Sequence, residues 1–331
     1  MDRRDFSRVA LFSWPILSNL PLLNSPIKPK KLQIGDRVGI ISPGSYITDE
    51  KLNKAIANLE ALGLKVSLSK NIRAKKGFTA GTVKQRIDDI HEMFSNPEIK
   101  AVWCARGGYG CGELLPHINY GLISKNPKIL IGYSDITALL HAVNLKTGLI
   151  TFHGPVASGE FTPYTQNEVK SLLFFPEQKR QILLKSNDTK SFTINKGEAH
   201  GILVGGNLTL LAAAAGTPYM PDLKGKIIII EEIGEKPYRI HRMLNQLKQA
   251  TNIKESAAIL LGQFWDCEPA NGELSLSLED TLRDVFHDFK QPIAYGFQWG
   301  HIDDIATVPI GINAFANTAD FTMTLQDNAV V

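Results

Sequence analysis

A serine stands between an apolar run and a helix-like run in the segment 128–137, which reads KILIGYSDIT. A strand, a tight turn and a helix in this order push Ser134 out at the carboxyl edge of a sheet, where its hydroxyl can attack an acyl group. The turn also aims the next backbone N–H, that of Asp135, at a developing oxyanion. Only the first half of the G-x-S-x-G pattern is present, because Ile136 replaces the second glycine. The alternative is that Ser134 caps the helix, for which serine is a preferred residue.

A second glycine-rich turn, RGGYGCG at 106–112, follows another apolar run. Glycines let backbone N–H groups approach an anion closely, so this turn is a candidate for the second oxyanion donor. It lacks the Gly-Lys-Ser/Thr of a Walker loop and does not fit G-x-G-x-x-G, so it does not indicate a nucleotide phosphate. A tight turn that needs positive φ angles explains the glycines equally well.

A serine hydroxyl is a poor nucleophile at neutral pH and needs a nearby base, usually a histidine oriented by a carboxylate. His301 lies in the loop QWGHIDD, directly after a strand-like run that ends at Phe297. Glu231 and Glu232 follow the apolar run 227–230, where a carboxylate would emerge at a sheet edge. Considered one at a time, each of these residues is better explained by a structural role.

Composition argues against several other classes of protein. The chain has 331 residues, 44% of them hydrophobic and 21% charged, as expected of a globular protein with one large or two medium domains. A net charge of +3 without long runs of like charge argues against nucleic-acid binding. The cysteines have no C-x-x-C spacing, and Ser95 stands where a zincin helix beginning at His91 needs its second histidine. We therefore expect no metal site.

From residue 36 onward, strand-like and helix-like segments alternate, which predicts a parallel sheet with helices on both faces. The alternation lapses in a polar stretch near 160–196 and then resumes, so we place a domain boundary there. The predicted organisation is an N-terminal segment (1–31), an N-terminal α/β domain (32–160), a linker region (161–198) and a C-terminal mixed α/β domain (199–331). We expect strands at 37–42, 65–68, 101–105, 129–132, 226–230, 257–261, 292–297, 306–312 and 321–325, and helices at 50–62, 82–94, 136–143, around 240–247 and at 278–286.

The N-terminus resembles a twin-arginine export signal, because Arg3 and Arg4 precede an apolar stretch from Val9 to Leu23. This stretch is short and interrupted by prolines and polar residues, so we expect no stable membrane span. No clear A-x-A cleavage site follows it. A disordered or docked N-terminal arm is the alternative. The compartment, periplasm or cytoplasm, therefore stays open.

Five ordered motifs together resemble the LD-carboxypeptidases, a family that contains the muramoyltetrapeptide carboxypeptidases and their microcin self-immunity relatives. The motifs are GYSDIT, RGGYG, GGNL at 205–208, IIIIEEIGEKPYRIHRML at 227–244, and the G-H-x-x-D-x-x-x-x-P-I-G run that begins at Gly300. The resemblance extends from about Leu32 to the C-terminus.

The resemblance implies a catalytic triad in the chain order Ser, Glu, His. Ser134 is then the nucleophile, His301 the general base and later the general acid, and Glu231 the carboxylate that orients the imidazole. Glu232 falls where the family commonly has Asp and is not expected in the triad. His241 departs from the family pattern, because Asp is frequent at its position.

The resemblance also implies two domains with the active site at their interface. The backbone N–H groups of Asp135 and of Gly107 or Gly108 are the expected oxyanion donors. Arg106 is expected to bind the terminal carboxylate of the substrate, with a structural ion pair as the alternative. No cofactor is expected, and homodimers are common in the family.

The activity that the resemblance implies is hydrolysis of the L,D-amide that joins the terminal D-Ala to a murein tetrapeptide, in recycling or remodelling of peptidoglycan. A microcin-type amidase that cleaves an acyl-adenylate analogue would use the same triad with a different pocket. A noncatalytic muropeptide-binding protein is a third possibility, but it would have lost a triad member, whereas Ser134, Glu231 and His301 are all present.

Overall fold

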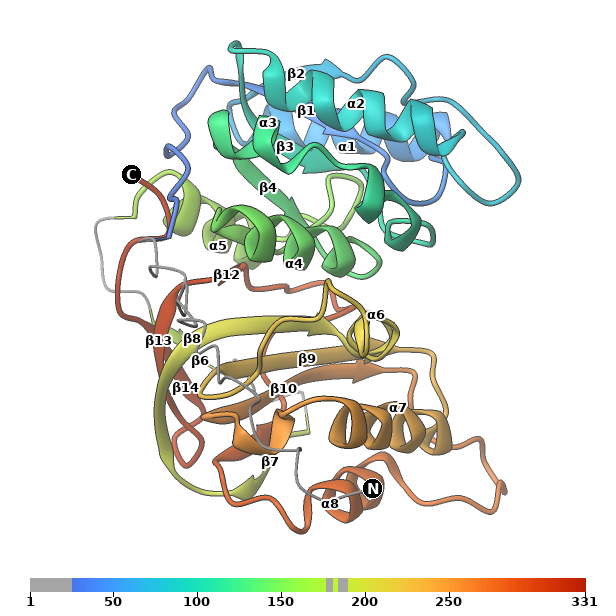
Figure 1. The fold of residues 1–331 in the computed structure, drawn as a ribbon, viewed down its shortest axis with the longest axis vertical. Coiled ribbons are helices and arrows are strands. Elements are labelled where there is room, and N and C mark those ends of the chain that lie inside the picture. The colour runs from blue at the N-terminus through green and yellow to red at the C-terminus, as the bar shows by residue number, and fades with distance from the viewer. Residues whose placement is uncertain (1–25, 177–180, 184–189) are drawn as a thin grey trace, which may run out of the picture.

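The computed structural model describes residues 26–176, 181–183 and 190–331, so the twin-arginine stretch of the sequence lies outside the described residues. Two sheets, one of six strands and one of eight, form the upper and lower parts of the molecule (Figure 1). The prediction of an N-terminal parallel-sheet domain followed by a mixed α/β domain is confirmed. None of the helices in the described ranges is both long and apolar enough to cross a bilayer.

The upper sheet has the strand order β12-β5-β4-β3-β1-β2. Its first five strands along the chain run parallel, and β12 pairs antiparallel with β5 at the edge. The strands are β1 (Arg37–Ile41), β2 (Lys65–Leu68), β3 (Ile99–Cys104), β4 (Ile129–Gly132), β5 (Thr151–His153) and β12 (Val308–Ile310). The helices around it are α1 (Asp49–Ala61), α2 (Val83–Ser95), η1 (Gly112–His117), α3 (Tyr120–Lys125), α4 (Ile136–Thr147) and α5 (Pro163–Leu173).

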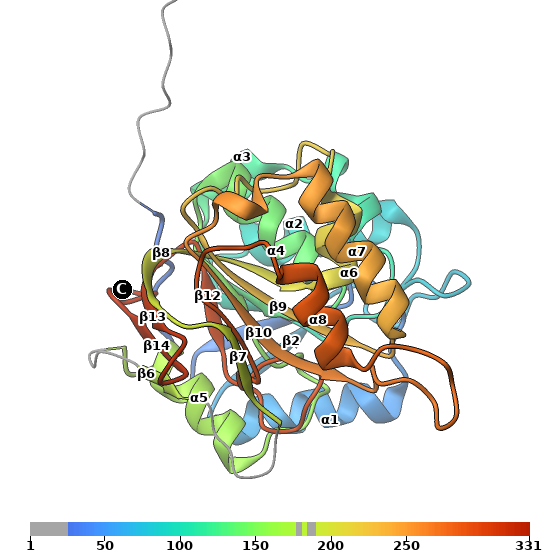
Figure 2. The ribbon, with the colours of Figure 1, turned by 90° about the horizontal axis from the view of Figure 1, so that it is seen from below.

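The lower sheet has the order β6-β14-β13-β8-β9-β10-β11-β7, with a parallel centre from β8 to β11 and antiparallel strands on both sides. Its strands are β6 (Gln181–Leu183), β7 (Phe192–Asn195), β8 (Glu198–Asn207), β9 (Ile227–Ile233), β10 (Ala258–Trp265), β11 (Ile293–Tyr295), β13 (Asn313–Asn317) and β14 (Thr322–Leu325). The remaining helices are α6 (Leu208–Ala214), α7 (Pro237–Ala250), η2 (Ile253–Glu255) and α8 (Leu278–Phe286), and the three α-helices cover one face of this sheet (Figure 2).

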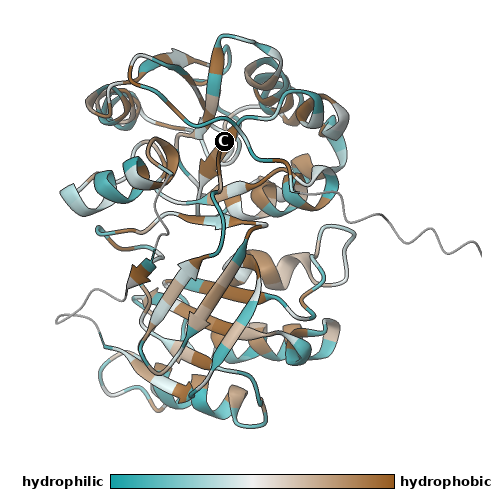
Figure 3. Ribbon diagram, turned by 90° about the vertical axis from the view of Figure 1, so that its left-hand side faces the viewer, coloured by the Kyte–Doolittle hydropathy of each residue, from teal (hydrophilic) through white to brown (hydrophobic). Residues whose placement is uncertain are grey.

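The sequence explains most of these elements locally. Thr82 and Gln85 form a capping box that starts α2, and each satisfies a backbone N–H that the helix leaves free. The isoleucines of β9 are buried on both faces of the lower sheet, as a central parallel strand requires. In α7 the buried residues Ile240, Leu244 and Leu247 form one stripe toward that sheet. Brown, hydrophobic segments recur in the strands of both sheets, and the helices alternate between brown and teal (Figure 3).

The chain crosses between the two sheets more than once. After β11 in the lower sheet it runs to β12 in the upper sheet, and it then returns to the lower sheet for β13. The residues between 161 and 198 that the structure describes form α5, β6 and β7, and β7 pairs with β11. The loop between β11 and β12, which carries His301, therefore lies where the chain passes from one domain to the other.

The two domains also share polar contacts between α4 and the end of β8. The Asn207 backbone N–H donates to Thr137 Oγ1 at 3.1 Å, and His141 Nε2 lies 2.7 Å from the Gly205 carbonyl oxygen. Apolar residues from both sheets belong to one continuous buried cluster, among them Phe152 of β5 and Leu203 of β8. The relative position of the domains, and with it any site between them, is therefore fixed by packing on both sides.

Candidate active site

Ser134 occupies a strained turn between β4, which ends at Gly132, and α4, which begins at Ile136. Its φ angle is +65°, a backbone conformation that non-glycine residues adopt rarely and that costs free energy. The helix N-cap is Asp135, not Ser134, so the interpretation of Ser134 as a capping residue is wrong. The residue is partly exposed, and no hydrogen bond joins its hydroxyl to another described residue. The turn thus presents an uncommitted serine hydroxyl at the carboxyl edge of the upper sheet.

The glycine-rich turn after β3 lies directly against this serine. A Cβ atom on Gly107 would be 2.9 Å from Ser134 Cβ, 3.1 Å from Ser134 Oγ and 3.3 Å from the Asp135 backbone nitrogen. Any side chain at position 107 would therefore collide with the serine. The structure brings together two of the predicted oxyanion elements, the Gly107 backbone and the Asp135 N–H, beside one hydroxyl.

Three hydrogen bonds hold the glycine-rich turn in this place. The Cys111 N–H donates to Asp135 Oδ2 at 2.9 Å, the Ser45 N–H donates to the Gly107 carbonyl at 3.3 Å, and the Tyr109 N–H donates to Ser45 Oγ at 3.1 Å. Ser45 comes from the loop after β1, and no motif in the sequence singled it out. The turn is therefore fixed by side chains from two neighbouring strand ends.

Arg106 lies beside the same turn. One of its Nη atoms donates to the Tyr46 carbonyl at 3.1 Å, and the other lies 3.5 Å from where a Gly108 Cβ would be. Within the part of the chain that the structure describes, no carboxylate pairs with this partly exposed guanidinium, so the structural ion pair considered as an alternative is not found. The other N–H groups of the Arg106 guanidinium are therefore available to donate hydrogen bonds to a ligand carboxylate.

Glu231 of β9 and His301 of the loop between β11 and β12 form a hydrogen-bonded pair. His301 Nδ1 is 2.8 Å from Glu231 Oε2, and the Glu231 side chain is 0% exposed, against 15% for His301. A histidine that donates from Nδ1 to a carboxylate keeps its Nε2 as an acceptor. Gly300, with φ of +124°, allows this approach, because a Cβ there would be 3.2 Å from Glu231 Cβ.

Tyr133 connects this pair to the serine turn. The Tyr133 and His301 rings meet edge to face with centroids 4.8 Å apart, and Tyr133 is the residue before Ser134. Burial and the nearby Glu231 carboxylate raise the pKa of Tyr133 to about 12, so the phenol stays neutral. The three predicted triad residues therefore converge on one region between the two sheets.

Glu232 has a different environment from Glu231, because neighbouring residues of a strand point to opposite faces. Its carboxylate accepts hydrogen bonds from Asn207 Nδ2 at 3.0 Å, Thr209 Oγ1 at 2.7 Å and the Thr209 N–H at 2.8 Å. Burial nevertheless raises the pKa of Glu232, with these hydrogen bonds opposing the shift. Glu232 thus ties β9 to the start of α6 and takes no part in the pair with His301.

Two buried histidines near the site were missed from the sequence. His141 bonds to the Gly205 carbonyl, whereas His153 is fully buried and neither of its ring nitrogens has a partner in the described chain. Burial lowers the pKa of each to about 4. The available signal was the end of the run ITFH at 150–153, since polar residues at the carboxyl end of a parallel strand face the site edge.

Two other histidines that the sequence singled out have hydrogen-bond partners in the structure. His241, at the position where the family pattern has Asp, lies on α7 with its Nε2 3.3 Å from Asp284 Oδ2. His91, considered above for a zincin helix, has its Nε2 2.9 Å from the Asn119 N–H and accepts that hydrogen bond. Both histidines lie outside the region where Ser134, Glu231 and His301 converge.

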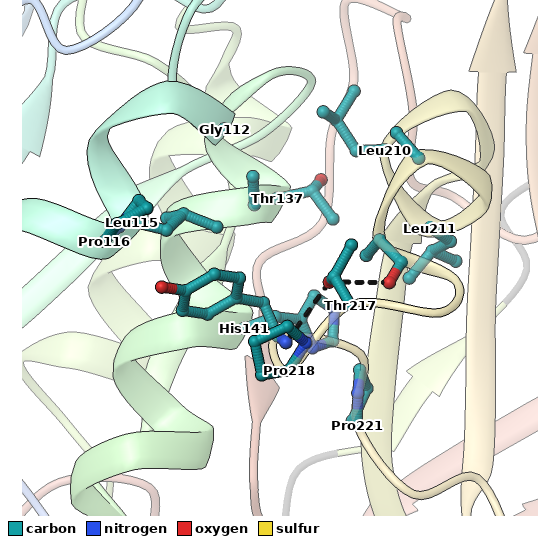
Figure 4. A pocket seen from close by; sticks show the side chains of 14 residues that line it. Gly112, Leu115, Pro116, Thr137, His141, Leu210, Leu211, Thr217, Pro218 and Pro221 are labelled. Carbon is teal, nitrogen blue, oxygen red and sulfur yellow. Dashed lines mark hydrogen bonds between the residues drawn. The ribbon is translucent and has the colours of Figure 1, made fainter.

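An apolar cavity of about 450 Å³ lies between α4 and η1 on one side and α6 with its following loop on the other (Figure 4). Thr137 and His141 of α4 face it from one domain, and Leu210 and Leu211 of α6 from the other. None of the three converging residues lines it.

Comparison with protein families matches residues 38–154 to the LD-carboxypeptidase N-terminal domain and residues 200–315 to the LD-carboxypeptidase C-terminal domain. The chain is 42% identical, over 304 residues, to the probable murein peptide carboxypeptidase of Bacillus subtilis, a match that covers 90% of this chain and 94% of the relative.

Solved structures of related proteins are also similar to this chain over most of its length. The muramoyltetrapeptide carboxypeptidase from Oxalobacter formigenes superposes with a TM-score of 0.77 at 31% identity, covering 87% of this chain and 97% of that one. The microcin C7 self-immunity protein MccF, in complex with glutamyl sulfamoyl guanosine, superposes with a TM-score of 0.83 at 26% identity, covering 92% of this chain and 100% of that one.

Proposed function

The chain belongs to the LD-carboxypeptidase family of peptidases, and we propose that it is a serine hydrolase that removes the terminal D-Ala of murein tetrapeptides. The observation that carries this proposal is the 2.8 Å hydrogen bond between His301 and the buried Glu231, beside the strained turn of Ser134. A base oriented by a carboxylate next to an uncommitted hydroxyl is the arrangement that activates a serine.

In the proposed reaction, Ser134 Oγ attacks the carbonyl carbon of the L,D-amide while His301 Nε2 accepts the hydroxyl proton. Glu231 stabilises the imidazolium that forms. The N–H groups of Asp135 and of Gly107 or Gly108 bind the oxyanion, each donor contributing on the order of 3 kcal/mol. His301 then gives its proton to the departing D-Ala nitrogen as the C–N bond breaks, which leaves an ester on Ser134.

Water completes the cycle. His301 accepts a proton from a water molecule, whose oxygen attacks the ester carbonyl, and the same proton returns to Ser134 Oγ as the C–O bond breaks. The products are the shortened peptide with a free carboxylate and the regenerated enzyme. Every proton transfer in this scheme passes through one imidazole nitrogen, Nε2, because Nδ1 stays bonded to Glu231.

We propose that Arg106 binds the free carboxylate of the terminal D-Ala. Replacing Arg106 by glutamine should raise KM about 10- to 100-fold with kcat little changed, since a charged hydrogen bond is lost from the bound substrate. The measurement is steady-state kinetics with a tetrapeptide and with its C-terminal carboxamide. Wild type should discriminate against the carboxamide and Arg106→Gln should not. Equal discrimination by both enzymes would show that Arg106 does not read the carboxylate.

A microcin-type amidase is the second candidate function, because MccF superposes over nearly the whole chain. The deciding experiment offers the purified protein a muramoyl tetrapeptide ending in D-Ala, the same peptide ending in L-Ala, and an acyl-adenylate analogue. We expect free D-Ala from the first peptide alone, measured with D-amino acid oxidase. Cleavage of only the acyl-adenylate analogue would favour the amidase. Binding of the tetrapeptide without any cleavage would favour a noncatalytic binding protein.

A further inference from the structure

His153, the last residue of β5, is an unusual buried group. Its exposed fraction is 0%, and neither Nδ1 nor Nε2 has a hydrogen-bond partner among the described residues. A neutral imidazole carries one N–H donor and one acceptor nitrogen, so both capacities are unused. Leaving a buried donor unsatisfied is costly, and most buried polar groups in native proteins are paired.

Glu231 has a complementary unused atom. Its Oε2 accepts the hydrogen bond from His301, whereas its Oε1 is buried without a partner in the same part of the chain. A carboxylate oxygen can only accept when it is ionised, and a neutral imidazole can donate. The donor that Glu231 lacks is thus the kind of group that His153 offers.

The fold brings together the ends of the strands that carry these two side chains. His153 is the register partner of Gly132, two residues before Ser134. On the other side, a Cβ on Gly206 would lie 3.2 Å from His153 Nδ1, and Asn207, the next residue of β8, is the register partner of Glu231. His153 therefore lies between the serine turn of the upper sheet and the Glu231 strand of the lower sheet.

We propose that His153 is a positioning residue that donates a hydrogen bond to Glu231 Oε1, directly or through one bridging water, and so fixes the carboxylate that orients His301. This inference rests on the serine mechanism proposed above. With both oxygens held, Glu231 cannot rotate away from His301 Nδ1 when the imidazole moves between its neutral and charged forms.

A neutral donor suits this role better than a charged one. Burial lowers the pKa of His153 to about 4, with the Glu231 charge opposing the shift, so the imidazole is neutral at pH 7. It therefore holds the carboxylate without cancelling the negative charge that stabilises the His301 imidazolium. Tyr133 meets both imidazoles edge to face, with its ring centroid 6.1 Å from that of His153 and 4.8 Å from that of His301.

The test compares His153→Gln, which keeps an N–H donor, with His153→Leu, which has a similar volume and none. We expect His153→Leu to lower kcat about 10- to 100-fold with KM unchanged, and His153→Gln to recover most of that loss. A purely structural role would make kcat follow stability instead, so thermal unfolding is measured for each variant. His153→Met provides a second apolar variant if the leucine protein does not fold.

His141 supplies a matched control, because it is also buried, with its pKa lowered to about 4, but its Nε2 already has partners, lying 2.7 Å from the Gly205 carbonyl oxygen and 3.2 Å from the Gly205 backbone nitrogen. His141→Gln and His141→Leu should differ in Tm but by less than about threefold in kcat. If the Gln and Leu variants of His153 have the same kcat, or if the His141 pair shows the same donor dependence, the proposal is wrong.

A second measurement tests the role of His153 independently of which substrate the enzyme cleaves. The rate at which a fluorophosphonate labels Ser134 depends on the triad and not on murein recognition. We expect labelling to slow in His153→Leu and to recover in His153→Gln even if murein peptides prove not to be substrates. Equal labelling rates in wild type and both variants would refute the role of His153 but leave the serine mechanism intact. A wild-type protein that is not labelled would refute both the serine mechanism and this inference.

Discussion

Replacing Ser134 by alanine should lower kcat for D-Ala release by about 10⁴-fold or more, to a residual rate supplied by binding and the oxyanion donors. The reason is that Ser134 Oγ is the atom proposed to bond to the acyl carbon, so its loss removes the covalent route. Free D-Ala is measured in a time course at saturating tetrapeptide. Ser95→Ala, an exposed serine at the end of α2, is the control and should behave as wild type.

The backbone of the same turn gives a prediction that does not depend on activity. Because Ser134 has a φ of +65°, glycine at this position should relieve strain. Ser134→Gly is therefore expected to be inactive yet more stable than Ser134→Ala, by about 1 kcal/mol in the free energy of unfolding. Denaturant titration of the two variants measures the difference. D-Ala release by either variant at a rate close to that of the wild type would refute Ser134 as the nucleophile.

Replacing Glu231 by glutamine should lower kcat by about 10³- to 10⁴-fold with the fold intact. Glutamine fills the same space beside His301, but it removes the charge that stabilises the imidazolium and can offer an N–H that forces the wrong tautomer. The expected result is a loss in kcat with little change in KM, measured by steady-state D-Ala release. Thermal unfolding of the same sample shows that the loss is not one of folding.

Glu232→Gln is the matched control for this second prediction. Glu232 is the neighbouring buried glutamate of β9, but its carboxylate bonds to Asn207 and Thr209, and within the described part of the chain no hydrogen bond joins it to His301. Its replacement should lower Tm while changing kcat by less than about tenfold. If kcat falls by the same factor in both glutamine variants, the hydrogen bond between Glu231 and His301 does not give Glu231 a separate role in catalysis.

The two predictions also distinguish the parts of the site. In the proposed mechanism Ser134 supplies the atom that forms a bond, so its loss removes the covalent route, whereas Glu231 acts through His301. A double variant, Ser134→Ala with Glu231→Gln, should therefore be no slower than Ser134→Ala. Independent, additive losses would indicate that the two residues do not act as one unit.

The sequence by itself determined the local features of the fold. An apolar run, a glycine and a following helix-like run placed β4 at Ile129–Gly132 and the start of α4 at Ile136, so the position of Ser134 at a strand-to-helix turn was predictable. The alternation of segments gave the α/β class, and the helix 278–286 was predicted with its observed limits. These features depend on the periodicity of neighbouring residues, which the sequence displays directly.

The family motifs predicted site residues that periodicity alone could not identify. Nothing in the spacing of Glu231 and Glu232 says which one meets His301; the family resemblance selected Glu231. In the structure Glu231 is the glutamate that bonds to His301, because the pairing of β8, β9 and β10 directs Glu231 toward the upper sheet and Glu232 toward α6. A one-residue shift of register would exchange the two side chains.

Only the tertiary structure decided which distant residues meet. Glu231 and His301 are 70 residues apart, and their contact depends on the chain leaving the lower sheet after β11 to add β12 to the upper one. The placement of His153 between the sheets and of Ser45 behind the glycine-rich turn has the same origin. Strand order and domain packing are set by burial summed over the whole chain, a long-range balance of free energies that no local pattern of residues records.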